Sequence, residues 1–116
     1  MLRPAGIHRI FLYDRSIDMR KSFEGLGFLV DSSYPGTLLS GSFFLFLNRN
    51  RTLIKILYWD GDGFAIWYKR LESGTFSGCF SGQAELSRQQ FTLLLEGITP
   101  KRLSRRFSLP KQQLTL

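Results

Sequence analysis

Residues 53–71 read LIKILYWDGDGFAIWYKRL, in which two runs of apolar, aromatic and β-branched residues flank Asp60-Gly61-Asp62-Gly63. Asp-Gly pairs readily adopt the positive φ angles of the tight turns that join antiparallel strands. Two strand-like runs separated by such a turn are typical of a β-hairpin. The sequence therefore predicts a hairpin in this stretch, with its loop at Gly61 and Asp62.

The register of this hairpin follows from its loop. The predicted cross-strand pairs are Trp59 with Phe64, Leu57 with Ile66, and Lys55 with Tyr68. Alternate residues of a strand point to opposite faces of the sheet. The other face is therefore expected to carry Ile54, Ile56, Tyr58, Ala65, Trp67 and Lys69. Because both faces are largely apolar, we expect the sheet to be covered on both sides.

Further strands are predicted upstream of the hairpin. Residues 42–47 (SFFLFL) are too apolar to alternate, which indicates a central strand, and the polar residues 48–52 form a link of hairpin length into Leu53. Residues 7–13 (IHRIFLY) are interpreted as a first strand. The sequence thus predicts a three-stranded meander to which the first strand adds a fourth.

Two helices are expected to pack on this sheet. The first is predicted from Met19 to Val30, with Asp18 placed to cap its free amide groups. Its apolar stripe is Phe23, Leu26, Leu29 and Val30. The second begins at Ser87, which forms a capping box with Gln90. Its apolar stripe is Phe91, Leu94, Leu95 and Ile98, with Gly97 as its C-cap and Pro100 beyond its end.

These elements predict a single α+β domain over residues 1–99, built on a mainly antiparallel sheet of about four strands with two packed helices. Residues 100–116 lack a clear period and are expected to form a basic C-terminal arm. The chain has 116 residues, a size at which a hydrophobic core needs no disulfide or metal. It has one cysteine, no apolar run of membrane-spanning length and no signal-peptide pattern, so we expect a soluble, cytoplasmic protein.

No catalytic or cofactor-binding set stands out in the sequence. His8 is the one histidine and lies in a strand-like run, and Cys79 lies in a Gly/Ser-rich loop with no cationic neighbours to activate it. Asp60 and Asp62 are explained by their turn, and the glutamate of a calcium loop is absent because Leu71 stands there. We therefore expect a non-catalytic protein with no cofactor and no metal. A metal-dependent nuclease is the weakest of the alternatives.

The positive charge is concentrated at the C-terminal end of the chain. The net charge is +7, and five of these charges come from residues 100–116, which contain no acid. A basic segment of this kind favours a polyanionic partner such as nucleic acid. The candidate nucleic-acid-binding residues are Arg20, Lys21, Arg49, Arg51, Lys55, Lys69, Arg70, Lys101, Arg102, Arg105 and Arg106. Some of these cations alternate with Trp67 and Tyr68, whose rings are suited either to stacking on bases or to the core.

Four segments together resemble a known family. Residues 10–13 (IFLY), 19–26 (MRKSFEGL), 53–76 (LIKILYWDGDGFAIWYKRLESGTF) and 85–98 (ELSRQQFTLLLEGI) are similar to the TnpB accessory proteins of bacterial insertion sequences of the sixty-six family. The resemblance implies a protein that is encoded beside a separate, larger transposase and is needed for efficient transposition. It also implies that the catalytic carboxylates belong to the transposase.

Two functional hypotheses follow. The first is a non-catalytic accessory protein for DNA transposition that binds the DNA backbone, the transposase of the same element, or both. The second is a module that makes protein–protein contacts alone, by docking on the transposase or by associating with a second copy of itself. A free apolar face would favour the second hypothesis, and a concave basic face would favour DNA.

Overall fold

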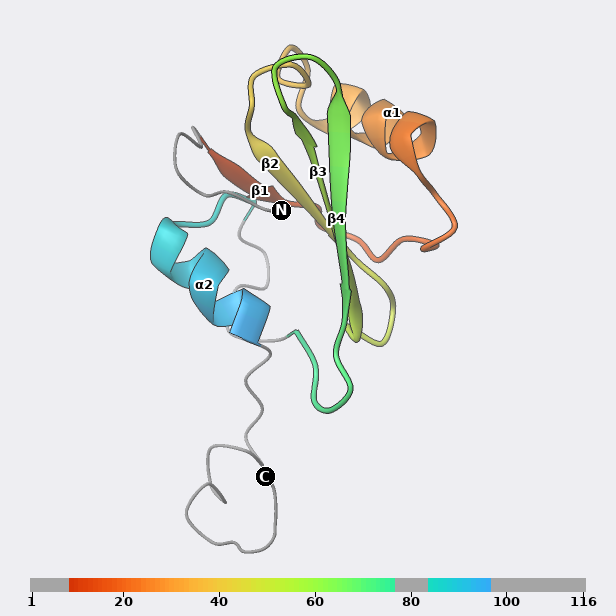
Figure 1. Ribbon diagram of the computed structural model, residues 1–116, viewed down its shortest axis with the longest axis vertical. Coiled ribbons are helices and arrows are strands. Elements are labelled where there is room, and N and C mark those ends of the chain that lie inside the picture. Colours follow the sequence, from red (N-terminus) through yellow and green to blue (C-terminus); the bar gives the residue numbers. More distant parts are fainter. Residues whose placement is uncertain (1–8, 77–83, 97–116) are drawn as a thin grey trace, which may run out of the picture.

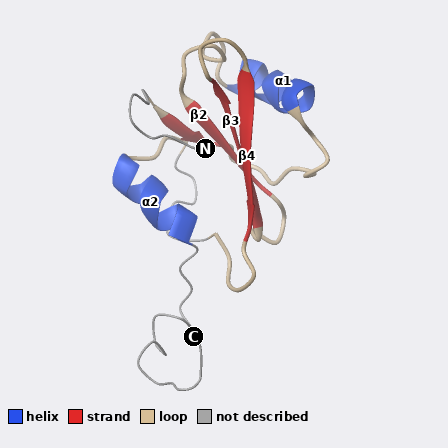
Figure 2. Cartoon of the chain, in the orientation of Figure 1, coloured by secondary structure: helices blue, strands red, loops and turns tan. Residues whose placement is uncertain are grey.

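The computed structural model describes residues 9–76 and 84–96. Its elements, in chain order, are β1 (Ile10–Leu12), α1 (Phe23–Ser33), β2 (Phe43–Leu47), β3 (Leu53–Trp59), β4 (Phe64–Arg70) and α2 (Arg88–Glu96). The strands form one sheet in the order β1-β2-β3-β4. The β2–β3 and β3–β4 pairs are antiparallel, and β1 lies parallel to β2. Figures 1 and 2 show the two helices on opposite sides of this sheet. The predicted α+β class is confirmed.

The predicted hairpin register is confirmed pair by pair. Trp59 faces Phe64, and the ladder continues without interruption to Leu53 and Arg70. The Asp60 amide donates to the Gly63 carbonyl oxygen at 2.8 Å, which closes the loop. Gly61 has φ +91°, the left-handed conformation that glycine adopts without strain. The turn therefore fixes the register, and the register fixes which side chains share a face.

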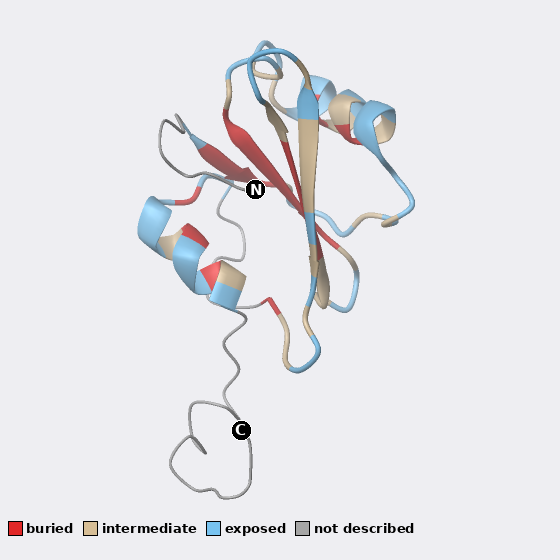
Figure 3. Cartoon of the chain, in the orientation of Figure 1, coloured by how far each residue is buried: buried red, intermediate tan, exposed pale blue. Residues whose placement is uncertain are grey.

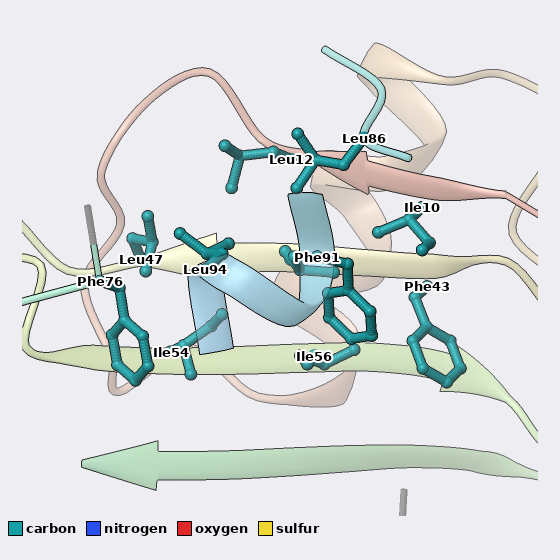
Figure 4. Close-up of a cluster of buried hydrophobic side chains, with 11 residues drawn as sticks. Ile10, Leu12, Phe43, Leu47, Ile54, Ile56, Phe76, Leu86, Phe91 and Leu94 are labelled. Carbon is teal, nitrogen blue, oxygen red and sulfur yellow. The ribbon is translucent and has the colours of Figure 1, made fainter. Parts of the chain in front are cut away.

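Each face of the sheet has its own apolar core, as the hairpin pattern predicts. On the face covered by α2, the buried cluster comprises Ile10, Leu12, Phe43, Leu45, Leu47, Ile54, Ile56, Phe76, Leu86, Phe91 and Leu94 (Figure 4). On the face covered by α1, it comprises Phe11, Leu26, Val30, Phe44, Phe46 and Leu57. Figure 3 shows that β2, whose five residues are all buried, lies between these two layers.

The first helix differs from its prediction at both ends. It begins at Phe23 and ends at Ser33 instead of spanning Met19 to Val30. Asp18 accepts a hydrogen bond from the Arg20 amide, and the Lys21 amide donates to the Asp18 carbonyl oxygen, so Asp18 stabilises a turn before the helix. An aspartate that satisfies nearby amides in a turn competes with helix initiation. Consequently Phe23, expected to be buried, lies at the helix entrance and is exposed.

The second helix is confirmed at its start. The Gln90 amide donates to the Ser87 hydroxyl at 3.1 Å, and the Ser87 amide donates to the Gln90 side-chain oxygen at 2.9 Å. Phe91 and Leu94 are buried, and Leu95 packs against their cluster. The predicted positions of Gly97, Ile98 and Pro100 lie outside the described residues.

Candidate nucleic-acid interface

The candidate residue Lys55 lies inside the fold. The residue is 7% exposed, and its side chain lies on the face of β3 that α1 covers. The ammonium donates to the carbonyl oxygens of Met19 at 2.8 Å and Lys21 at 2.7 Å, and it lies 4.8 Å from the centre of the Tyr68 ring. The two carbonyl groups and the aromatic ring together offset the free-energy cost of burying a positive charge. Lys55 therefore fastens the turn before α1 to the sheet.

Two more of the candidate cations donate to backbone carbonyls of other elements. The Lys69 ammonium donates to the carbonyl oxygen of Leu95, near the C-terminal end of α2, at 3.3 Å. This is the end of a helix at which carbonyl groups favour a cation. The Arg51 guanidinium donates to the Phe76 carbonyl oxygen at 2.8 Å. Both side chains thus connect the sheet to segments that follow it in the chain.

Arg20 and Arg70 are paired with carboxylates on the surface. Arg20 forms a bidentate ion pair with Asp18, whose pKa is lowered because the guanidinium donates hydrogen bonds to it. Arg70 lies 3.2 Å from the Glu72 carboxylate, and both side chains are largely exposed. Exposed ion pairs contribute little stability. These two arginines can therefore exchange their partners at little cost in free energy.

Lys21 and Arg49 are exposed, and neither side chain has an ion pair with another described residue. The described candidates form three groups around the end of the sheet where β2 ends and β3 begins. Arg20, Lys21 and Lys55 lie around the turn before α1, Lys69 lies on the α2 face, and Arg49, Arg51 and Arg70 lie at the end of the sheet where β3 begins. The tail candidates Lys101, Arg102, Arg105 and Arg106 lie outside the described residues. Their role as nucleic-acid contacts remains a prediction.

The structure exposes apolar side chains that the sequence patterns did not single out. Phe28, on the outer side of α1, is 71% exposed, and Leu39, in the loop after α1, is 62% exposed. Phe23 at the start of the same helix is also exposed. A helical projection provides the missing signal, because Phe28 falls on the side opposite Leu26 and Val30. Scattered exposed apolar residues are normal on a protein surface, whereas a contiguous apolar patch marks a contact site.

Within residues 9–76 and 84–96, no three His, Cys, Asp or Glu side chains lie close enough together to hold a metal ion. Asp60 and Asp62 are exposed at the hairpin turn. His8 and Cys79 lie outside the described residues.

Comparisons with known proteins identify relatives of this chain. The sequence model of a family described as "IS66 Orf2 like protein" matches residues 8–105. Two proteins of Sinorhizobium fredii are similar along most of their length. Uncharacterized protein y4jC is 31% identical over 108 residues, covering 91% of this chain and 92% of the relative. Uncharacterized protein y4hO is 32% identical over 98 residues, covering 82% and 85%. No solved structure matches.

Among the described residues, no helix is both long and apolar enough to cross a membrane.

Proposed function

Because the chain belongs to the IS66 Orf2-like family, which is associated with transposition in an accessory role, we propose that it is a non-catalytic accessory protein that binds the transposase of its own element. The resemblance to the TnpB accessory proteins is thereby confirmed at the level of the family. The binding partner and the absence of catalysis belong to the proposal.

The observation that carries the proposal is the contrast between charged and apolar side chains in the described domain. Lys55, Lys69 and Arg51 already donate to backbone carbonyls within the fold. Meanwhile Phe28 and Leu39 expose large apolar side chains beside α1. Desolvated aromatic side chains are the usual anchors of protein–protein interfaces. Three of the candidate cations therefore serve the fold, and the exposed apolar side chains beside α1 support a protein partner.

The experiment is a pull-down with two purified proteins, this chain and the transposase, with and without DNA from the ends of the element. Phe28→Ser is expected to weaken transposase capture roughly tenfold, because a central aromatic anchor is lost. Leu93→Ser is the matched control, since Leu93 is an exposed apolar residue on α2. Circular dichroism would verify that both variants are folded.

Two results would contradict the proposal. One is that the wild-type chain fails to capture purified transposase in either condition. The other is that Phe28→Ser and Leu93→Ser weaken capture equally, which would leave α1 with no special part in the contact. Capture that requires DNA would instead favour the second candidate function.

That second candidate is contact with the DNA backbone through residues 100–116. It is supported by the charge distribution, since this segment holds Lys101, Arg102, Arg105, Arg106 and Lys111 without an acidic residue. Phosphate contacts made by such a segment are independent of sequence and sensitive to salt. The two candidates are compatible, because they assign different parts of the chain to the two partners.

A further inference from the structure

The two edge strands of the sheet differ in whether another segment forms backbone hydrogen bonds with their outer side. The outer edge of β1 is covered by residues 84–86: the Leu12 amide donates to the Ala84 carbonyl oxygen and the Leu86 amide donates to the Ile10 carbonyl oxygen, both at 2.8 Å. β4 forms the opposite edge, and among the described residues no segment pairs with its outer side. In Figure 1, β4 lies in front of the other strands with α1 and α2 to either side.

The hydrogen-bond pattern identifies the backbone groups on this open edge. Two hydrogen bonds show which residue pairs of the hairpin are hydrogen-bonded. The Asp60 amide donates to the Gly63 carbonyl oxygen at one end, and the Leu71 amide donates to the Thr52 carbonyl oxygen at the other. In an antiparallel pair, alternate residues direct their amide and carbonyl groups away from the partner strand. In β4 these residues are Phe64, Ile66, Tyr68 and Arg70.

β4 has few of the features by which sheet edges usually avoid pairing. It contains no proline, and its ladder with β3 is continuous, so no bulge turns it away. Tyr68 is 52% exposed and Phe64 is 37% exposed. Its charged side chains, Lys69 and Arg70, occupy one end alone. An edge of this kind is a template for another strand.

We propose that the occupant of this edge is β4 of a second copy of the chain, paired antiparallel. The distribution of charge supports this occupant and this direction. The turn that precedes β4 carries exposed Asp60 and Asp62. The far end carries Lys69 and Arg70, followed by Glu72, whose carboxylate lies 3.2 Å from the Arg70 guanidinium, so cations outnumber acids there by two to one. Antiparallel pairing of two identical strands brings the basic end of each copy to the acidic turn of the other. Parallel pairing would place like charges together.

The pairing is centred on Trp67, the middle residue of β4. In this register, Arg70 lies opposite Phe64 of the second copy, close to the turn of that copy that carries Asp62, while Glu72 extends toward the same turn. Lys69 lies opposite Ala65, so no two cations face each other. All four outward-facing residues then exchange backbone hydrogen bonds with the second copy. This proposal is independent of the transposase contact, which was assigned to α1.

Charge reversal tests the proposal on the full-length chain by sedimentation equilibrium in about 50 mM salt, where surface charges are weakly screened. The wild type is expected to dimerise. Arg70→Glu is expected to raise the dimer dissociation constant roughly tenfold, because the far end of each copy becomes net negative beside the acidic turn of the other. Asp62→Lys, which leaves the turn without net charge, should raise it less. An equimolar mixture of the two variants should associate more tightly than either variant alone, since one of its two symmetry-related contacts again joins opposite net charges. Arg88→Glu, a reversal of an exposed charge on α2, is the control.

A second pair of variants tests the backbone hydrogen bonds. Tyr68→Pro removes an outward-facing amide, and edge strands tolerate proline at such positions. It should abolish the dimer, whereas Tyr68→Thr, which keeps the amide, should retain it. The proposal is overturned if the wild type remains monomeric at about 100 μM. It is also overturned if the mixed variants associate no better than each alone, or if Tyr68→Pro and Tyr68→Thr behave alike.

Discussion

Lys55 shows how one side chain can be interpreted in two ways. In the sequence it is a cation near aromatic residues, which is typical of a nucleic-acid surface. In the structure its ammonium is bonded to the carbonyl oxygens of Met19 and Lys21, residues more than thirty positions away in the chain. Such acceptors are backbone atoms and leave no pattern in the sequence. A buried lysine of this kind could therefore be recognised only from the fold.

Replacing Lys55 with methionine tests this structural role. Lys55→Met keeps the aliphatic stem but leaves two carbonyl groups without their donor, so the free energy of unfolding should fall by about 2 kcal/mol. Urea denaturation followed by tryptophan fluorescence measures the change. Lys21→Met, which removes an exposed cation of the same turn, should change it by less than about 0.5 kcal/mol. Unchanged stability with weaker DNA binding would instead favour the nucleic-acid role of Lys55.

At the scale of the elements, the sequence predicts strands and helices best where their position depends only on residues close together in the chain. The hairpin register follows from a two-residue loop, and the start of α2 follows from the reciprocal bonds of Ser87 and Gln90; both predictions are confirmed. The start of α1 was predicted wrongly because Asp18 is used in a turn before the helix. Phe76, in a Gly/Ser-rich segment, is fully buried against α2, which depends on tertiary packing that periodicity cannot reveal.

The capping box of α2 provides a prediction at this scale. Ser87→Ala removes the acceptor of the Gln90 amide, so it should lower the free energy of unfolding by about 1 kcal/mol. Thr92→Ala is the control, because Thr92 lies on the exposed side of the same helix and its hydroxyl donates to the Arg88 carbonyl oxygen, a bond the helix does not require. Thermal or urea unfolding distinguishes the two variants. Equal free energies of unfolding for the two variants would show that the capping box does not stabilise α2.

At the scale of the whole molecule, charge and apolar surface are separated along the chain. The first 99 residues carry a net charge of only +2, and residues 100–116 carry the other five positive charges. The position of this boundary remains a prediction, and the family match extends past it to residue 105. The separation itself gives a measurable expectation for DNA binding.

If the five cations of residues 100–116 contact phosphates, the logarithm of DNA affinity should fall with the logarithm of salt concentration at a slope of about −4 to −5. Removing residues 100–116, or replacing these five cations with glutamine in the full-length chain, should flatten the slope. Fluorescence anisotropy with labelled duplex DNA measures it. No affinity at about 50 mM salt, or a slope that neither variant changes, would exclude this segment as the contact.

The bridge between Phe11 and Glu85 has a consequence for the synthesis of this protein. On the ribosome, β2, β3 and β4 emerge consecutively and can pair as soon as each is complete. β1 emerges first, yet the strand-like segment that covers its outer edge is among the last parts of the domain to be made. Until residues 84–86 have left the ribosome, the outer edge of β1 has no partner within the described part of the chain. Closing this edge joins the beginning of the described domain to its last elements.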